Sequence, residues 1–237
     1  MNRWVASLTS SVGLKFIMAA TGALLFGFVV AHLAGNLQIF GGPELINSYA
    51  AKLKALGPGL WVARLGLLGL FALHLGTAAV LTRRNRSARP VSYAVKRPIA
   101  SSEASRTMLA SGAVVLLFVI YHLMHFTIGI VIRPDLHELV DDQGRHDVYS
   151  MMVVGFQQLP IALFYLLAMV GLGLHLSHGI GSIFQSAGWL GARYRPMIVL
   201  GGRALAWLIV LGNVGIVLAA FFGVLELPEW YPSTGGA

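Results

Sequence analysis

Long apolar segments alternate with short polar connections along the whole chain. Five segments are each long enough to cross a bilayer, which takes about 20 apolar residues in a helix. They are residues 13–38, 61–82, 107–132, 158–183 and 198–224. Together they take up more than half of the 237 residues, which leaves no room for a sizeable soluble domain. The pattern predicts one all-α integral membrane domain over residues 1–237, whose first four helices form an up-and-down bundle.

The connections are short and contain residues that end helices. Residues 39–60 carry Gly and Pro at both ends, and the stretch from Glu44 to Leu56 between them is predicted to form a short interfacial helix. Residues 83–106 and 184–197 are predicted loops on one side of the membrane, and residues 133–157 an acidic loop on the other. The sequence shows no evident internal repeat.

Composition agrees with a membrane protein. Hydrophobic residues make up 57% of the chain and charged residues only 11%, whereas soluble domains average about 25% charged residues. The chain has no cysteine. Disulfides, thiolate metal sites, cysteine-ligated iron–sulfur clusters and covalently attached c-type haem are therefore excluded within it.

The charges are distributed unevenly between the two sides. Twelve of the seventeen Lys and Arg residues lie in the N-terminal segment and the second and fourth connections, whereas eight of the nine Asp and Glu residues lie on the opposite side. Basic loops stay in the cytoplasm. We therefore expect a multi-pass protein of a bacterial inner membrane with a cytoplasmic N-terminus and an outer C-terminus. The net charge of +8 reflects this topology and contact with anionic lipid, and nucleic-acid binding is not expected.

Histidines supply the candidate chemistry. Six of the eight lie inside four different apolar segments, where an ionisable side chain is costly and normally faces the bundle interior or a cofactor. They are His32, His74, His122, His125, His175 and His178. Four helices that each offer an inward imidazole match the requirement of two bis-histidine haems.

Depth along the helices sorts four of these histidines into two pairs. At 1.5 Å per residue, His74 and His175 lie roughly 12–13 Å from the cytoplasmic ends of their segments, and His32 and His122 roughly 24–25 Å from theirs. Each pair joins alternate segments. An inner haem between His74 and His175 and an outer haem between His32 and His122 are thus predicted, with the backbone carbonyl four residues earlier as the expected acceptor of each ligand's second ring nitrogen.

His125 and His178 each follow a predicted ligand by three residues, so they lie on nearly the same helix face. An H-x-x-H pair is also a zinc-binding pattern, but no carboxylate or cysteine is near enough in the sequence to complete the set. Three alternatives stay open for these two histidines: partners of haem propionates or of a quinone, ordinary core residues, or ligands in place of their neighbours.

The sequence resembles a known family. The run from Phe28 to Asn36, followed by Gly42-Pro43-Glu44 and Asn47-Ser48-Tyr49-Ala50, is similar to the first span and loop of the di-haem cytochrome b subunit of succinate dehydrogenases. The motifs of its later spans also have counterparts here. These are Leu73-His74-Leu75-Gly76, Phe118-Val119-Ile120-Tyr121-His122-Leu123-Met124-His125 and His175-Leu176-Ser177-His178-Gly179.

The resemblance implies a membrane anchor that carries two haems b and binds a flavoprotein (FAD) subunit and an iron–sulfur subunit on its cytoplasmic face. Electrons from succinate would pass through the iron–sulfur partner and the two haems to a quinone, with menaquinone expected. Higher-order oligomers are compatible with it. The candidates for haem-propionate and neighbouring positions are His125, His178, Lys15, Arg84 and Arg106, and those for the quinone site are Asn36, Gln38 and Glu44. The chain itself is not expected to oxidise succinate.

One departure from the family concerns protons. Some di-haem fumarate reductases carry a membrane glutamate two residues before the fourth-span ligand, and this position is Gly173 here. A proton path of that kind is not expected. Three alternatives for the function remain: the same role in a quinol:fumarate reductase, a proton or metal transporter with a histidine relay, and a purely structural anchor.

Overall fold

The computed structural model describes residues 3–88, 107–131 and 134–231. Within these ranges every regular element is helical, apart from one isolated bridge between Val140 and His146. The elements are α1 (Arg3–Thr9), α2 (Ser11–Asn36), η1 (Leu37–Gly41), α3 (Pro43–Lys54), α4 (Pro58–Ser87), α6 (Met108–Leu123), η2 (Met124–Ile128), η3 (Pro134–His137), α7 (Val148–Gln157), α8 (Leu159–Ser186) and α9 (Arg195–Phe221).

Five helices of the described residues are long and apolar enough to cross a membrane, which confirms the predicted number of spans. They are α2 with η1, α4, α6 with η2, α8 and α9. The interfacial helix predicted from Glu44 is present as α3, with Pro43 in its first turn, where the missing N–H of proline costs nothing. The largest difference is in α4, which continues to Ser87.

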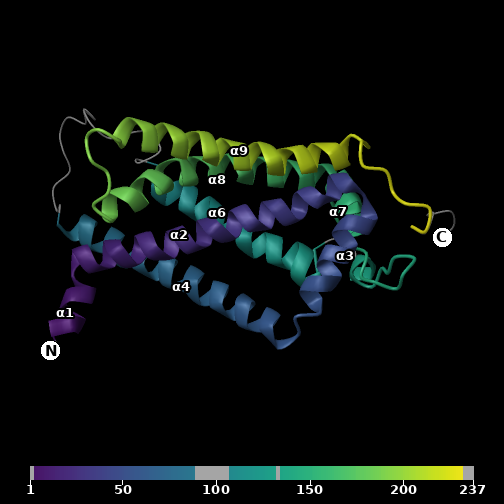
Figure 1. The fold of residues 1–237 in the computed structure, drawn as a ribbon, viewed down its shortest axis with the longest axis horizontal. Coiled ribbons are helices and arrows are strands. Elements are labelled where there is room, and N and C mark those ends of the chain that lie inside the picture. Colours follow the sequence, from purple (N-terminus) through teal and green to yellow (C-terminus); the bar gives the residue numbers. More distant parts are fainter. Residues whose placement is uncertain (1–2, 89–106, 132–133, 232–237) are drawn as a thin grey trace.

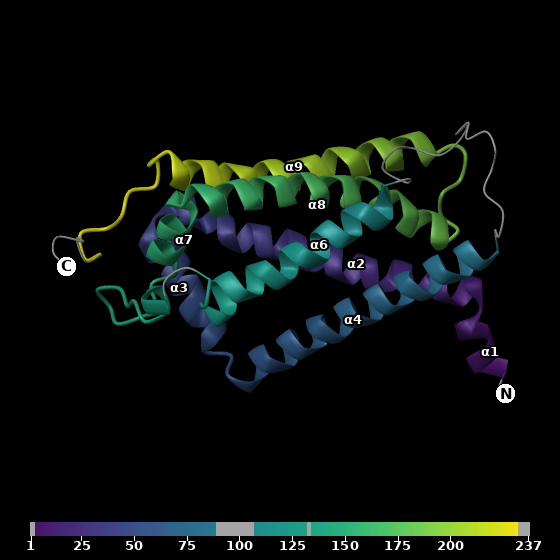
Figure 2. The ribbon, with the colours of Figure 1, turned by 180° about the vertical axis from the view of Figure 1, so that it is seen from behind.

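The helices run side by side along the long axis, with α1 at one end of the molecule and α3 and α7 at the other (Figures 1 and 2). α8 is the central helix and packs on α9, α6 and α2, whereas α4 packs extensively on α2 alone. Half of the residues in the apolar stretch of α8 are buried, compared with only 6% of those in the apolar stretch of α4. The two pairs α2/α4 and α6/α8 therefore meet mainly through α2 and α8, and the inner face of α4 has little helix packed against it.

The prediction that residues 133–157 form only a loop is wrong, because the segment contains α7. Asp147 begins this helix by accepting a hydrogen bond from the Ser150 N–H at 3.0 Å. All residues from Tyr149 to Phe156 are buried, and α7 packs against α9, α3 and α8. Its apolar run is too short to cross a bilayer, so it lies across the end of the bundle beside α3 (Figure 1).

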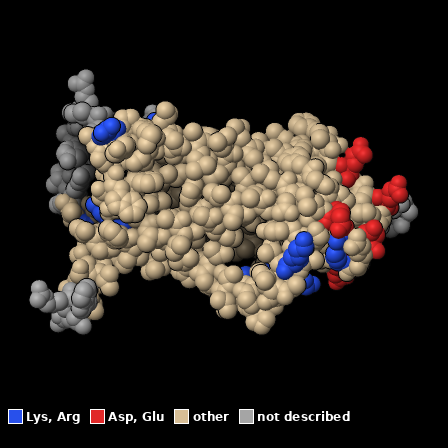
Figure 3. All heavy atoms as spheres, viewed as in Figure 1, with Lys and Arg blue, Asp and Glu red and all other residues tan. Residues whose placement is uncertain are grey.

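The surface divides into a broad apolar belt and two polar ends. Acidic side chains gather at the end that carries α3, α7 and the 138–147 loop, and Lys and Arg lie at both ends (Figure 3). Many large apolar side chains of the belt are exposed, such as Leu68, Leu117 and Leu211. A bilayer would cover such a belt.

Candidate functional site

The four depth-matched histidines meet in two pairs between the helices, with His74, His122 and His175 half-buried and His32 exposed. The ring centroids of His74 on α4 and His175 on α8 lie 6.5 Å apart with an interplanar angle of 73°. Those of His32 on α2 and His122 on α6 lie 5.8 Å apart at 85°. The structure thus brings together the same two pairs that depth along the helices predicts, each from alternate membrane helices.

The two pairs are further apart than the sequence estimate. Thr21 contacts the His74 ring and lies eleven residues before His32 on α2, and Ser111 contacts the His175 ring eleven residues before His122 on α6. Eleven residues of α-helix rise about 16 Å. The depths counted from the loop boundaries predict a separation of the two layers of only about 11–12 Å at the same rise per residue.

The separation of the ring centroids in each pair suits two imidazoles that hold one metal ion between them. A metal–imidazole bond is about 2.0 Å long and the ring centre lies about 1.1 Å behind the nitrogen, so two rings on one ion are about 6.2 Å apart. The two observed separations, 5.8 and 6.5 Å, lie on either side of this value. No group of three or more His, Cys, Asp or Glu residues that would suit a bare metal ion occurs in the described residues. Paired imidazoles are the donor set of a bis-histidine haem.

The inner pair receives hydroxyl groups from the neighbouring helices, which the sequence analysis did not predict. Thr21 Oγ1 lies 3.0 Å from His74 Nδ1, and Ser111 Oγ lies 3.4 Å from His175 Nδ1. Both hydroxyl residues are 4% exposed. These partners come from α2 and α6 rather than from the carbonyl four residues earlier on the histidine's own helix.

At the outer pair, one tyrosine connects a predicted ligand to a second histidine. The Tyr165 hydroxyl lies 3.2 Å from His122 Nδ1 and 2.9 Å from His125 Nδ1. A π-helical turn from Met124 to Ile128 follows His122 and rotates the later residues relative to an α-helix. His125 is buried against Phe126, with ring centroids 3.9 Å apart, and it still shares the Tyr165 hydroxyl with His122, so the two histidines face the same side of α6 and its π-helical turn.

The predicted propionate partners have mixed surroundings. Arg84 donates a hydrogen bond to the Thr9 carbonyl at 2.8 Å and so joins α4 to α1. Lys15 is exposed on the first turns of α2. His178 lies near Arg203 of α9, and Arg106 lies outside the described residues. Within the described residues, no direct contact joins Lys15, Arg84 or His178 to a partner histidine on another helix.

Of the predicted quinone-site residues, Glu44 has a clear structural partner. Its carboxylate accepts two hydrogen bonds from Arg145, at 2.9 and 2.6 Å, and one from Gln143 at 2.9 Å. The Arg145 hydrogen bonds, aided by its charge, lower the pKa of Glu44. Asn36 and Gln38 are half-buried at the end of α2. Asn36 follows His32 by four residues, so these two share a helix face.

Arg145 also binds Asp141, and this joins α3 to the 138–147 loop. Arg145 Nε donates to Asp141 Oδ2 at 2.7 Å. Burial acts to raise the pKa of Asp141, but the hydrogen bonds from Arg145 and Gln143 outweigh it and the pKa is lowered. The two carboxylates in turn raise the pKa of Arg145, with the Glu44 hydrogen bond as the largest cause. Below this cluster, the fully buried Asn47 donates to Asp147 Oδ1 at 3.0 Å and accepts from the Tyr149 N–H at 3.0 Å.

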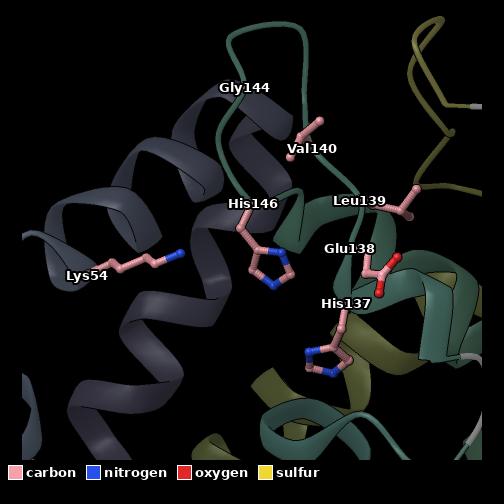
Figure 4. Close-up of a pocket in the computed structure, with 7 residues that line it drawn as sticks. All are labelled: Lys54, His137, Glu138, Leu139, Val140, Gly144 and His146. Atoms are coloured by element: carbon pink, nitrogen blue, oxygen red, sulfur yellow. The ribbon is translucent and has the colours of Figure 1, made fainter.

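A surface hollow of about 360 Å³ opens beside this outer end. His137, His146 and Lys54 point into it (Figure 4). The two imidazoles are stacked at 5.9 Å, and burial, followed by the charges of His137 and Lys54, lowers the pKa of His146 despite a hydrogen bond with the Leu139 backbone. His137 Nε2 lies 3.4 Å from the His125 carbonyl, so the hollow adjoins the outer layer. The sequence analysis did not select these residues, although His137 and His146 are the two histidines outside the spans.

No known protein family model, curated protein or solved structure matches the chain.

Proposed function

We propose that this protein is the membrane anchor and electron-transfer subunit of a succinate:quinone oxidoreductase, and that it binds two haems b. The observation that carries the proposal is the pair of histidine layers, with ring separations of 6.5 and 5.8 Å between alternate helices. His74 and His175 would hold the inner haem, and His32 and His122 the outer haem. Each bound haem would accept and donate single electrons, because two imidazoles leave no open position on the iron.

The chain's own residues would orient and enclose these groups. The inner layer lies toward the end with α1 and the α8–α9 connection, and the basic side chains near this end would place it on the cytoplasmic face. The iron–sulfur and flavoprotein partners would dock on this end, so that electrons enter at the inner layer. The acidic end with α3 and α7 would face outward (Figure 3).

The quinone would bind at the outer end, next to the His32–His122 layer. Two sites there are consistent with the geometry. Asn36 shares a face of α2 with His32, and the hollow beside His125 offers the ammonium group of Lys54, next to the rings of His137 and His146 (Figure 4). A quinone carbonyl requires such donors. Glu44 is the weakest of the candidates because Arg145 and Gln143 already bind its carboxylate.

A pyridine haemochrome assay on the purified protein tests the proposal. We expect two haems b for each chain, and one haem in each of the four single alanine variants of the ligands. The variants of His74 and His175 should lose the same haem, and those of His32 and His122 the other. His178→Ala, which changes a histidine of the same helix as His175, serves as the control and should retain both. A colourless protein, or a common loss in the His74 and His32 variants, would refute the assignment.

The quinone site is tested separately, in the assembled complex. We expect His137→Ala/His146→Ala to slow quinone reduction while both haems remain reducible by succinate. Asn36→Ala is the competing variant. If only the Asn36 variant slows quinone reduction, the hollow is not the site.

A further inference from the structure

A repeat becomes evident once the contacts of the inner histidines are known. Residues 18–33 (MAATGALLFGFVVAHL) and 108–123 (MLASGAVVLLFVIYHL) are identical at eight of sixteen positions. The first belongs to α2 and the second to α6. Both copies end with an outer-layer histidine and its following leucine. The expectation of no internal repeat was wrong. The repeat is short, and it lies in apolar segments whose similar composition makes a match of this length hard to recognise.

Equivalent positions of the repeat make equivalent contacts. Thr21 and Ser111 correspond, and each hydroxyl meets Nδ1 of an inner histidine on the adjoining helix. The next residue is glycine in both copies. A Cβ added at Gly22 would lie 3.3 Å from His74 Cε1, and one added at Gly112 would lie 3.4 Å from His175 Cε1. Each copy of the repeat therefore provides a hydroxyl group next to Nδ1 and leaves space next to Cε1 of the facing histidine ring.

The same correspondence extends to the outer layer. Phe28 and Phe118 occupy equivalent positions, one turn before His32 and His122. Their ring centroids lie 5.4 and 5.5 Å from those of the following histidines. α2 and α6 thus place a phenylalanine beside their outer histidine in the same manner, while only His122 is also joined to Tyr165 of α8.

The hydroxyl groups are placed to accept a hydrogen bond from Nδ1 of each inner imidazole. The Thr21 hydroxyl lies within donor distance of the Ile17 and Met18 carbonyls, at 2.8 and 3.1 Å, and the Ser111 hydroxyl lies 3.2 Å from the Met108 carbonyl. When its single proton is used for a carbonyl of its own helix, the hydroxyl oxygen can accept from the facing imidazole. An imidazole that binds iron through Nε2 carries its proton on Nδ1 and is then the donor of this hydrogen bond.

We propose that Thr21-Gly22 and Ser111-Gly112 are two matching seats that orient His74 and His175 as Nε2 ligands of one iron. The proposal rests on the proposed function. These four residues are positioning residues and contact only the ligands. An acceptor at Nδ1 increases the basicity of the metal-bound nitrogen, which stabilises ferric over ferrous iron. The seats would therefore lower the midpoint potential of the inner haem specifically.

Redox titration of the assembled complex tests the hydroxyl component. We expect Thr21→Val and Ser111→Ala each to favour the ferrous form of the inner haem by about three- to tenfold, which raises its potential by ~30–60 mV. The His74→Ala protein identifies the inner haem as the one it lacks. Thr21→Ser and Ser111→Thr retain a hydroxyl and should keep the original potential.

Thr77 provides a matched control. It is also 4% exposed, and its hydroxyl donates to the Leu73 carbonyl on its own helix without contacting a histidine. Thr77→Val should leave both potentials unchanged. If neither hydroxyl variant shifts the inner potential beyond this control, or if both haems shift equally, the seats are refuted. If Thr21→Val does not assemble, Ser111→Ala, which introduces no larger side chain, decides the outcome.

Electron paramagnetic resonance of the oxidised protein tests the glycine component. We expect Gly22→Ala and Gly112→Ala to move the low-spin line of the inner haem, because the added methyl group displaces the ligand ring. Gly27→Ala on α2 is the control, since a Cβ there would meet no atom within 4 Å. If the low-spin line of the inner haem is unchanged in both variants, the proposed role of the two glycines is refuted. A haem-free unsubstituted protein would overturn the proposed function itself, whereas two haems with unchanged signals in the variants would overturn only the seats.

Discussion

Replacement of Tyr165 by phenylalanine tests whether one hydroxyl connects the outer histidines. Tyr165 is 4% exposed in the centre of an aromatic cluster, and its ring would be retained in Tyr165→Phe. The variant removes contacts of 3.2 Å to His122 Nδ1 and 2.9 Å to His125 Nδ1. The phenol can accept from a protonated Nδ1 and can donate to an unprotonated one, so it can bond both imidazoles at once. Both rings lose a partner at once.

The cost follows from the number of bonds lost. Hydrogen bonds between membrane helices contribute about 0.6 kcal/mol on average and up to about 1.7 kcal/mol, and an unpaired buried polar group adds to this. We expect Tyr165→Phe to lower the free energy of unfolding by ~2 kcal/mol, or the melting temperature by roughly 4–8 °C for a chain of this size. Circular dichroism of the detergent-solubilised protein measures the change.

Tyr121→Phe is the matched control, because Tyr121 lies in the same cluster and no hydrogen bond of its hydroxyl is found in the described residues. We expect it to change stability by less than about 0.5 kcal/mol. His125→Leu combined with Tyr165→Phe should cost less than the sum of the two single variants, since both remove the same bond. Equal melting temperatures for the Tyr165 and Tyr121 variants, or strict additivity in the double variant, would refute the bridging role.

Three further predictions concern the packing and the outer end. Asn47→Ala should lower the unfolding free energy by ~2–3 kcal/mol, because it leaves the buried Tyr149 N–H without its acceptor and removes one donor from Asp147. Ser48→Ala, which removes only a hydrogen bond to the nearby Leu45 carbonyl, should have a smaller effect in the same thermal assay. The pKa values of Glu44 and Asp141 are lowered in the folded protein, so their ionised forms stabilise the outer end. This stabilisation is fully present above pH values equal to their ordinary pKa values of 4.5 and 3.8, and it is lost as the pH falls through the lower folded values. Hydrogen exchange of residues 138–147 should then accelerate at low pH, and Arg145→Gln should remove this pH dependence. Gly173→Ala should destabilise the α8–α9 contact, since its Cβ would lie 2.9 Å from Val210 Cγ2, whereas Gly179→Ala has open space and should be tolerated when melting is compared.

The sequence was sufficient for the parts of the fold that depend on length and apolarity. A span needs a long apolar run, and the five runs are unambiguous. The helical rise then places each histidine at a depth, which is why the pairs His74–His175 and His32–His122 could be predicted. The spacing between the layers was underestimated because it was counted from loop boundaries. α4 continues to Ser87, beyond the predicted boundary.

Other features depend on contacts that the sequence does not encode locally. α7 is apolar but too short for a span, and only its packing against α9 and α3 makes it helical and buried. The π-helical turn after His122 could not be predicted from the spacing. Thr21, Ser111 and Tyr165 are common residues in membrane helices, and they become informative only when the helix that each one faces is known.

Iron ligation and a proton relay place different demands on the inner pair. If His74 and His175 bind iron through Nε2, each carries its proton on Nδ1, next to the hydroxyl of Thr21 or Ser111. Two unprotonated Nε2 atoms cannot hydrogen-bond each other, so this arrangement needs a bound ion between the rings. A relay would instead require one of these nitrogens to take up a proton and to release it again as the ring turns or changes tautomer. The centroid separation of 6.5 Å is close to the value for two imidazoles on one ion, and it supports the proposed bound metal over a transported proton.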